Sequence, residues 1–146
     1  MKQEDFKFIG VDAGNSAVKY AYFCGGQIRF GMVPNITGRA IALDIPPASP
    51  HDEDIISARV LSADDDEHRK EHFVGELARR QLQEYAGQDR SRNKADSDSV
   101  NVILPAVLGL LDTEEPIVLG VGATLQDYAT QAPLLQKKLT RRHEVI

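Results

Sequence analysis

Hydrophobic and polar positions alternate in short runs over the first quarter of the chain, which is typical of strands. The run at 6–12, FKFIGVD, becomes apolar on both faces toward its end, as in a strand covered on both sides. Residues 17–24, AVKYAYFC, are rich in aromatic and β-branched side chains, and 27–33, QIRFGMV, alternates. Between these two runs, Gly25 and Gly26 suit the positive φ angles of a two-residue hairpin turn. The pattern predicts three consecutive antiparallel strands.

The next segment combines turn signals with a second pair of short strands. Several prolines and weak periodicity over 34–54 predict a long loop or a surface excursion. The apolar runs 55–61 and 72–75 are joined by the polar tip 62–71, which predicts a second hairpin. We therefore predict a small outer subdomain over 34–75.

The apolar residues of the next segment recur at helical spacing. This spacing predicts a helix over 76–86, ended by Gly87. After a polar loop at 88–99, a buried helix is predicted over 98–112, capped near Ser97 or Asp98. Pro105 lies inside the second helix, where a proline removes a backbone donor. It either kinks that helix or marks the start of a shorter one.

The last part of the chain is expected to hold one strand and one helix. Residues 117–121, IVLGV, predict a buried strand, and Thr130 is placed to cap a helix over 130–142. The final residues 144–146, EVI, resemble a strand that has just begun.

Composition narrows the class of protein. A chain of 146 residues with 42% hydrophobic content can bury one core and is expected to form one domain. The net charge of −5 is spread over mixed stretches, so we expect no direct nucleic-acid partner and no membrane partner. One cysteine and the absence of an apolar leader predict a cytoplasmic protein.

One turn carries the residue types of an anion-binding loop. In 12–19, DAGNSAVK, an acid ends one strand and Lys19 stands on the returning strand. Gly14 followed by the small polar Asn15 and Ser16 lets backbone N–H groups approach an oxyanion, because a Cβ would block the turn or the ligand. Asp12 would then hold Mg²⁺ through water, since Mg²⁺ gives up its hydration shell reluctantly. Lys19 would neutralise phosphate charge.

The same residues also have a purely structural interpretation. Asp12 and Asn15 can make Asx-type hydrogen bonds in a tight turn, and Lys19 can be a solvated strand residue. The loop lies between two predicted strands and does not precede a helix. It is therefore neither a Walker loop nor a dinucleotide fingerprint, whose amides come from a helix N-terminus. The eight residues alone leave a phosphate site and a structural turn both open.

Strand, DxG(S/N)xxxK turn and returning strand together resemble the first phosphate motif of the actin, Hsp70 and sugar-kinase superfamily. A second landmark, 73-FVGELARRQ-81, is similar to a segment in the N-terminal domain of actin-like proteins of the plasmid-segregation type (ParM/StbA-like). The helix at 100–111 and the strand at 117–123 follow in that family's order. The chain departs from the family at 120-GVGA-123, where members usually have a Gly-Leu-Pro turn.

This resemblance implies an α/β domain of the actin-like, ribonuclease-H-like type, with a five-stranded mixed sheet, flanking helices and the outer subdomain at 34–75. It implies that 1–146 is the N-terminal domain of an ATP-binding, filament-forming protein of plasmid or DNA segregation, without its C-terminal nucleotide-binding half. ATPase activity is then expected of the complete protein and not of these residues alone. The implied partners are ATP or ADP, further copies in a filament and a DNA-bound adaptor protein.

The resemblance also implies a role for each residue of the loop. Asp12 is the expected catalytic and metal-binding residue, because it would position Mg²⁺ and its water. The residues expected to hold the β- and γ-phosphates of ATP are Gly14, Asn15, Ser16, Ala17 and Lys19.

Two other functions remain open on the sequence. The chain could be half of a small-molecule kinase that resembles type III pantothenate kinase, whose N-terminus carries a similar Asp-x-Gly-Asn-(Ser/Thr)-x-x-Lys stretch; the segment 73–81 favours the actin-like protein. It could also be a non-enzymatic, partner-binding fragment.

Two further clusters of residues are compatible with binding but have simpler explanations. His68 and His72 stand beside acidic residues on the predicted hairpin tip, where a solvated turn is the better interpretation than a metal site. Gly120, Gly122 and Ala123 could form a second anion loop, but the end of a strand explains them.

Overall fold

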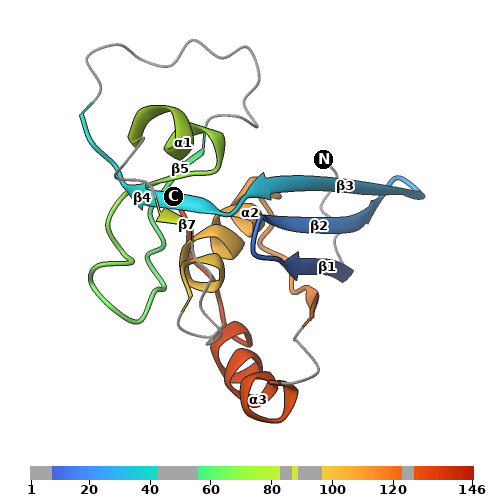
Figure 1. Ribbon diagram of the computed structural model, residues 1–146. Coiled ribbons are helices and arrows are strands. Elements are labelled where there is room, and N and C mark those ends of the chain that lie inside the picture. Colours follow the sequence, from blue (N-terminus) through green and yellow to red (C-terminus); the bar gives the residue numbers. More distant parts are fainter. Residues whose placement is uncertain (1–7, 43–55, 83–86, 89–96, 123–126) are drawn as a thin grey trace.

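The computed structural model describes residues 8–42, 56–82, 87–88, 97–122 and 127–146. These residues form two four-stranded sheets with helices packed against them (Figure 1). The first sheet has the strand order β3-β2-β1-β8. Its strands are β1 (Phe8–Ala13), β2 (Ala17–Cys24), β3 (Gln27–Pro34) and β8 (Val118–Val121).

The first three strands form the predicted antiparallel meander. Each of them pairs antiparallel with the next, whereas β8 adds to β1 in parallel, so the sheet is mixed as expected. Gly25 and Gly26 have φ angles of 59° and 75°, the left-handed values that a primed hairpin turn requires. We expected five strands in this sheet, and the described residues form four.

The second sheet has the order β5-β6-β4-β7. It consists of β4 (Ile36–Arg39), β5 (Ile56–Ala58), β6 (His72–Val74) and β7 (Gly87–Gln88), with the short helix α1 (Glu76–Leu82) against it. The antiparallel pairing of β5 with β6 confirms the second predicted hairpin. Residues 87–88 belong to this sheet, so it extends beyond the predicted subdomain boundary at 75. The predicted helix over 76–86 is described only as far as Leu82, and 83–86 lie outside the described residues.

The expectation of a loop from residue 34 was wrong for its first part. Pro34 is the last residue of β3, and β4 begins two residues later. The run at 36–39, ITGR, has a short alternating pattern that the preceding Pro34 obscured. A proline lacks only one backbone donor and is tolerated at the edge of a sheet, and β3 is an edge strand here. The rest of the predicted loop, 43–54, lies outside the described residues.

One apolar core joins the two sheets. It contains Ile9, Val11 and Val18 from the first sheet together with Ile56 and Val74 from the second. Alternation along each strand directs these side chains to one face, here called the inner face. The inner face packs against the buried helical segment between residues 99 and 110, which supplies the remaining large side chains of the core: Val102, Ile103, Leu104 and Val107.

The opposite, outer face of the first sheet carries exposed apolar side chains. Phe30 is 84% exposed, and five further large apolar residues on this face are also exposed: Phe8, Phe23, Ile28, Met32 and Val118. The register places them in cross-strand rows, because Phe8 is paired with Val118 and Phe23 with Ile28. Among the described residues, no helix covers this face (Figure 1).

The predicted helix at 98–112 consists of two segments. A π-helical segment, η5 (Ser99–Ile103), is followed by α2 (Leu104–Leu110). Pro105 lies in the first turn of α2 and cannot donate to the carbonyl of Asn101, four residues earlier. The second of the two alternatives was therefore correct, and Pro105 marks the start of a shorter helix.

Helix α3 (Tyr128–Leu139) begins before the predicted start, and Thr130 does not cap it. Thr130 lies in the first turn, where its hydroxyl donates to the carbonyl of Asp127 at 3.1 Å. The last residues pair as a strand would, since Val145 forms an antiparallel bridge with Val60, just beyond β5. None of the helices in the described ranges combines the length and apolar character that crossing a bilayer requires.

Candidate functional site

The predicted phosphate loop is the turn of the β1–β2 hairpin. Asp12 is the second-last residue of β1, and Lys19 is the third residue of β2. The two are directly paired across the ladder, with the next pair, Ala13 and Val18, closing the strands before the turn. The structure thus brings all of the predicted site residues together on one hairpin.

The two charged side chains of the hairpin lie on one exposed face. Ala17 and Val18 are buried, whereas Asp12 and Lys19 are exposed. Directly opposed residues of an antiparallel pair point to the same side of the sheet, so the carboxylate and the ammonium group share the outer face. Asn15 and Ser16, at the tip, are exposed as well. The bend is open to solvent on this side.

Gly14 is required by a close approach and not by its φ angle. A Cβ at this position would lie 3.1 Å from the carbonyl oxygen of Ala17, which is tighter than an ordinary contact. Among the residues that the structure describes, the left-handed φ angles belong to other positions and not to Gly14. An alanine would push the two sides of the turn apart.

A buried asparagine that sequence reasoning missed holds the loop from its inner side. Asn35, between β3 and β4, is 1% exposed. Its Nδ2 group donates to the carbonyl oxygens of Gly14 at 3.0 Å and Asn15 at 3.4 Å, and its backbone N–H donates to the carbonyl of Ser16 at 3.0 Å. One residue therefore contacts three successive carbonyl oxygens of the turn.

The buried hydroxyl of Ser99, the first residue of η5, fixes this asparagine in turn. Ser99 Oγ donates to Asn35 Oδ1 at 2.9 Å, which leaves the Nδ2 end of the amide facing the loop. The only hint in the sequence is a polar residue in the run 33-VPNI-36, and the partner lies 64 residues away.

The tip of the second hairpin, 62–71, is held by ionic groups in solvent. The hydrogen bond from Arg141 holds the pKa of Asp64 below its ordinary value, and the backbone N–H of His68 does the same for Asp65. Arg39, 2.6 Å from Glu67, lowers the pKa of that carboxyl. These shifts arise from hydrogen bonds and ion pairs of exposed carboxylates, and they do not indicate a catalytic acid.

The two histidines that were considered as metal ligands have separate partners. His68 lies between Asp65 at 2.6 Å and Asp98 at 3.1 Å. His72 is buried, and its Nδ1 is 2.7 Å from the carbonyl of Lys70. At the other candidate, the N–H of Gly122 donates to the carbonyl of Val11 at 3.4 Å and continues the β1–β8 ladder, as the end of a strand would. Ala123 lies outside the described residues.

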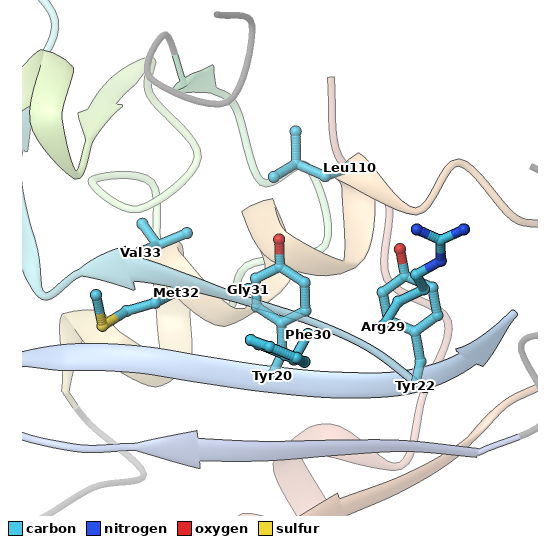
Figure 2. A pocket seen from close by; sticks show the side chains of 8 residues that line it. All are labelled: Tyr20, Tyr22, Arg29, Phe30, Gly31, Met32, Val33 and Leu110. Atoms are coloured by element: carbon cyan, nitrogen blue, oxygen red, sulfur yellow. The ribbon is translucent and has the colours of Figure 1, made fainter. Parts of the chain in front are cut away.

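A hollow on the inner face of β2 and β3 is a second candidate location for a ligand. It has a volume of about 240 Å³. Figure 2 shows the rings of Tyr20 and Tyr22 projecting from β2 toward Leu110, with the guanidinium group of Arg29 near Tyr22. The two rings are stacked, with centroids 6.4 Å apart, and Tyr20 lies over Gly31. The hollow is on the opposite face of the sheet from Asp12 and Lys19, so it is separate from the loop.

The family model for the N-terminal domain of actin-like proteins matches residues 10–146. The chain belongs to this family. The structure explains the glycine in the segment 73-FVGE-76, which was the second point of resemblance to this family. Gly75 has a φ angle of 66°, and a Cβ there would meet Val33 at 3.0 Å. No curated protein matches the chain.

Solved structures share the fold of this actin-like domain. Bacillus thuringiensis ParM in its apo form superposes with a TM-score of 0.73 at 19% identity, over 97% of this chain and 40% of that one. Apo pSK41 ParM superposes with a TM-score of 0.70 at 15% identity, over 94% of this chain and 43% of that one. The AlfA filament structure from Bacillus subtilis plasmid pLS32 superposes with a TM-score of 0.62 at 19% identity, over 95% of this chain and 49% of that one. The chain thus spans less than half the length of each of these relatives.

Proposed function

We propose that residues 1–146 are the N-terminal domain of an ATP-binding, filament-forming actin-like protein that acts in plasmid or DNA segregation. Solved relatives of the same fold support this proposal, because they include Bacillus thuringiensis ParM with ATP and an AlfA filament bound to AMPPNP. The proposal rests on one observation. Asp12 and Lys19 face each other on the exposed side of a turn whose carbonyl oxygens are held from the buried side.

The proposed role of the loop is to bind phosphate and a metal ion. An exposed carboxylate beside a solvent-open turn fits a hydrated cation, so Asp12 would hold Mg²⁺ through water. The amides of Gly14 to Ala17 and the ammonium group of Lys19 would contact the β- and γ-phosphates. When bound, Mg²⁺ would neutralise part of the phosphate charge. Catalysis in the complete ATPase then rests on positioning and charge neutralisation.

The remainder of the proposal concerns parts of the protein beyond this loop. We propose that a C-terminal half closes the nucleotide cleft and that the complete sheet has five strands. The outer subdomain predicted at 34–75 would serve contacts along the filament. A DNA-bound adaptor protein would link the filament to its cargo in the cytoplasm.

The test is nucleotide-dependent assembly of the full-length protein. Light scattering and phosphate release are measured with Mg-ATP, Mg-ADP and no nucleotide. We expect Mg-ATP to drive assembly and phosphate release, and Asp12→Ala to abolish release. The control is Glu115→Ala, which removes an exposed carboxylate outside the loop and should change neither signal.

Two results would contradict the proposal. One is assembly of Asp12→Ala with the same nucleotide dependence as the wild type. The other is turnover of a pantothenate-like substrate without assembly, which would instead identify a small-molecule kinase.

A further inference from the structure

The hydrogen bonds of Asn35 determine which way the peptide groups of the loop point. Its side chain holds the carbonyl oxygens of Gly14 and Asn15 from the core side. In a planar trans peptide the C=O and the following N–H point in opposite directions. The N–H groups of Asn15 and Ser16 are therefore turned away from Asn35.

This orientation places two dipoles beside the two charged side chains of the site. Successive N–H groups that converge on one side of a turn attract an anion. Asp12 and Lys19 flank that same turn on the exposed face. A phosphate in front of the turn would meet the two N–H groups and the ammonium group together.

The orientation depends on which end of the Asn35 amide faces the loop. If the amide were rotated by half a turn, Oδ1 would oppose the carbonyl oxygens of Gly14 and Asn15, and this contact is repulsive. The hydroxyl of Ser99 donates to Oδ1 and so favours the observed orientation. Because both side chains are buried, water does not readily substitute for either hydrogen bond.

We propose that Asn35 is a positioning residue of the phosphate loop, held by Ser99: it fixes the peptide groups of Asn15 and Ser16, whose N–H groups are among those already proposed to contact the nucleotide phosphates. This inference rests on the proposed function and deepens it. Asn35 acts through the loop carbonyls and does not itself touch the ligand.

The experiment measures the affinity of the full-length protein for Mg-ATP, Mg-ADP and adenosine. In Asn35→Ala and Asn35→Asp we expect the two phosphate-bearing ligands to bind about tenfold more weakly, which corresponds to about 1.4 kcal/mol. Binding of adenosine, which has no phosphate, should stay the same. In Ser99→Ala we expect a weaker loss, about threefold, because the amide keeps its bonds to the loop but loses the group that orients it.

Thr37→Val provides the matched control. Thr37 is buried two residues further along the chain, and its hydroxyl donates to the carbonyl of Phe73 at 2.9 Å, away from the loop. The variant removes one buried hydrogen bond at nearly constant volume. We expect its melting temperature to fall while its affinity for Mg-ATP remains that of the wild type.

Lys19→Ala separates failure of this inference from failure of the proposed function. If the wild type binds Mg-ATP, Lys19→Ala weakens it, and both Asn35 variants bind like the wild type, the inference alone is overturned. If the wild type does not bind Mg-ATP, the proposed function and the inference both fail.

Hydrogen exchange gives a measurement that needs no variant. In the wild type, Mg-ATP should slow amide exchange of Asn15 and Ser16, and adenosine should not. Unchanged exchange at these two amides under saturating Mg-ATP would overturn the inference even if the Asn35 variants failed to fold.

Discussion

The two hairpin loops of this domain are held in opposite ways. The β1–β2 turn is fixed by the buried Asn35, whose neutral side-chain amide bonds to two of its carbonyl oxygens and whose backbone N–H bonds to a third. The β5–β6 tip, 62–71, is fixed by exposed charge pairs such as Arg39 with Glu67 and Arg141 with Asp64. A buried hydrogen bond is costly to lose, whereas an exposed ion pair competes with water and salt. The first turn is therefore suited to present its backbone in one orientation, and the second is held more weakly.

Both loops are nevertheless attached to the start of η5. Ser99 bonds to Asn35, behind the first turn, and its neighbour Asp98 lies 3.1 Å from His68 on the tip. The start of η5 therefore connects to both hairpins. Variants of Asn35 and Ser99 test the buried hydrogen bonds behind the first turn, and variants of the tip 62–71 test its exposed ion pairs.

The largest effect on stability is expected for Asn35→Ala. The change leaves the carbonyl oxygens of Gly14 and Asn15 and the buried Ser99 hydroxyl without their amide partner. We expect the free energy of unfolding to fall by about 2–4 kcal/mol, as measured by urea denaturation. A loss below about 0.5 kcal/mol would show that water replaces the amide and would remove the contrast between the two loops.

Ser99→Ala should have an intermediate effect. It removes one buried hydrogen bond and leaves the loop contacts of Asn35 in place. The expected loss of unfolding free energy is about 1–2 kcal/mol in the same denaturation measurement. If Ser99→Ala cost more than Asn35→Ala, the hydroxyl would have a role beyond holding the amide.

Acid should weaken the tip 62–71. The pKa values of Asp64, Asp65 and Glu67 are lowered in the folded protein, so these carboxylates stabilise it above their ordinary pKa values. This contribution disappears as the pH falls below about 4 and the groups become protonated. When thermal unfolding is followed from pH 7 to pH 3, the melting temperature should fall less in Asp64→Asn than in the wild type.

Salt provides the control for this pH effect. All three carboxylates are exposed and therefore screened by salt. About 1 M salt should reduce the difference in melting temperature between the wild type and Asp64→Asn. A difference that salt does not change would indicate that the tip is less solvated than its exposure suggests.

The smallest effect is expected for Glu67→Gln. Its partners Arg39 and Lys70 are exposed, and pairs of this kind add little to stability. We expect no measurable change in melting temperature at pH 7. A clear decrease would show that the exposed ion pairs of the tip stabilise it as strongly as the buried hydrogen bonds stabilise the first turn, which would contradict the difference between the two loops.

Much of the local structure was predictable because it depends on neighbours in the chain. Strand β2 and the Gly25-Gly26 turn follow from residue type and alternation over a few positions. Strand β4 was missed, because its four residues carry too little pattern to outweigh the turn signal of the preceding Pro34. The π-helical segment before Pro105 was also missed, although the proline itself indicated an interruption.

The sequence by itself determined the residue types of the loop and their order along one hairpin: an acid, a glycine, two small polar residues and a lysine. Only the tertiary structure decided how the loop is held, because Asn35 and Ser99 are separated by 64 positions and meet through packing of η5 on the inner face. Local patterns arise from hydrogen bonds and periodicities of a few residues. A buried polar contact between distant segments leaves no such pattern, since its geometry exists only after the core has formed.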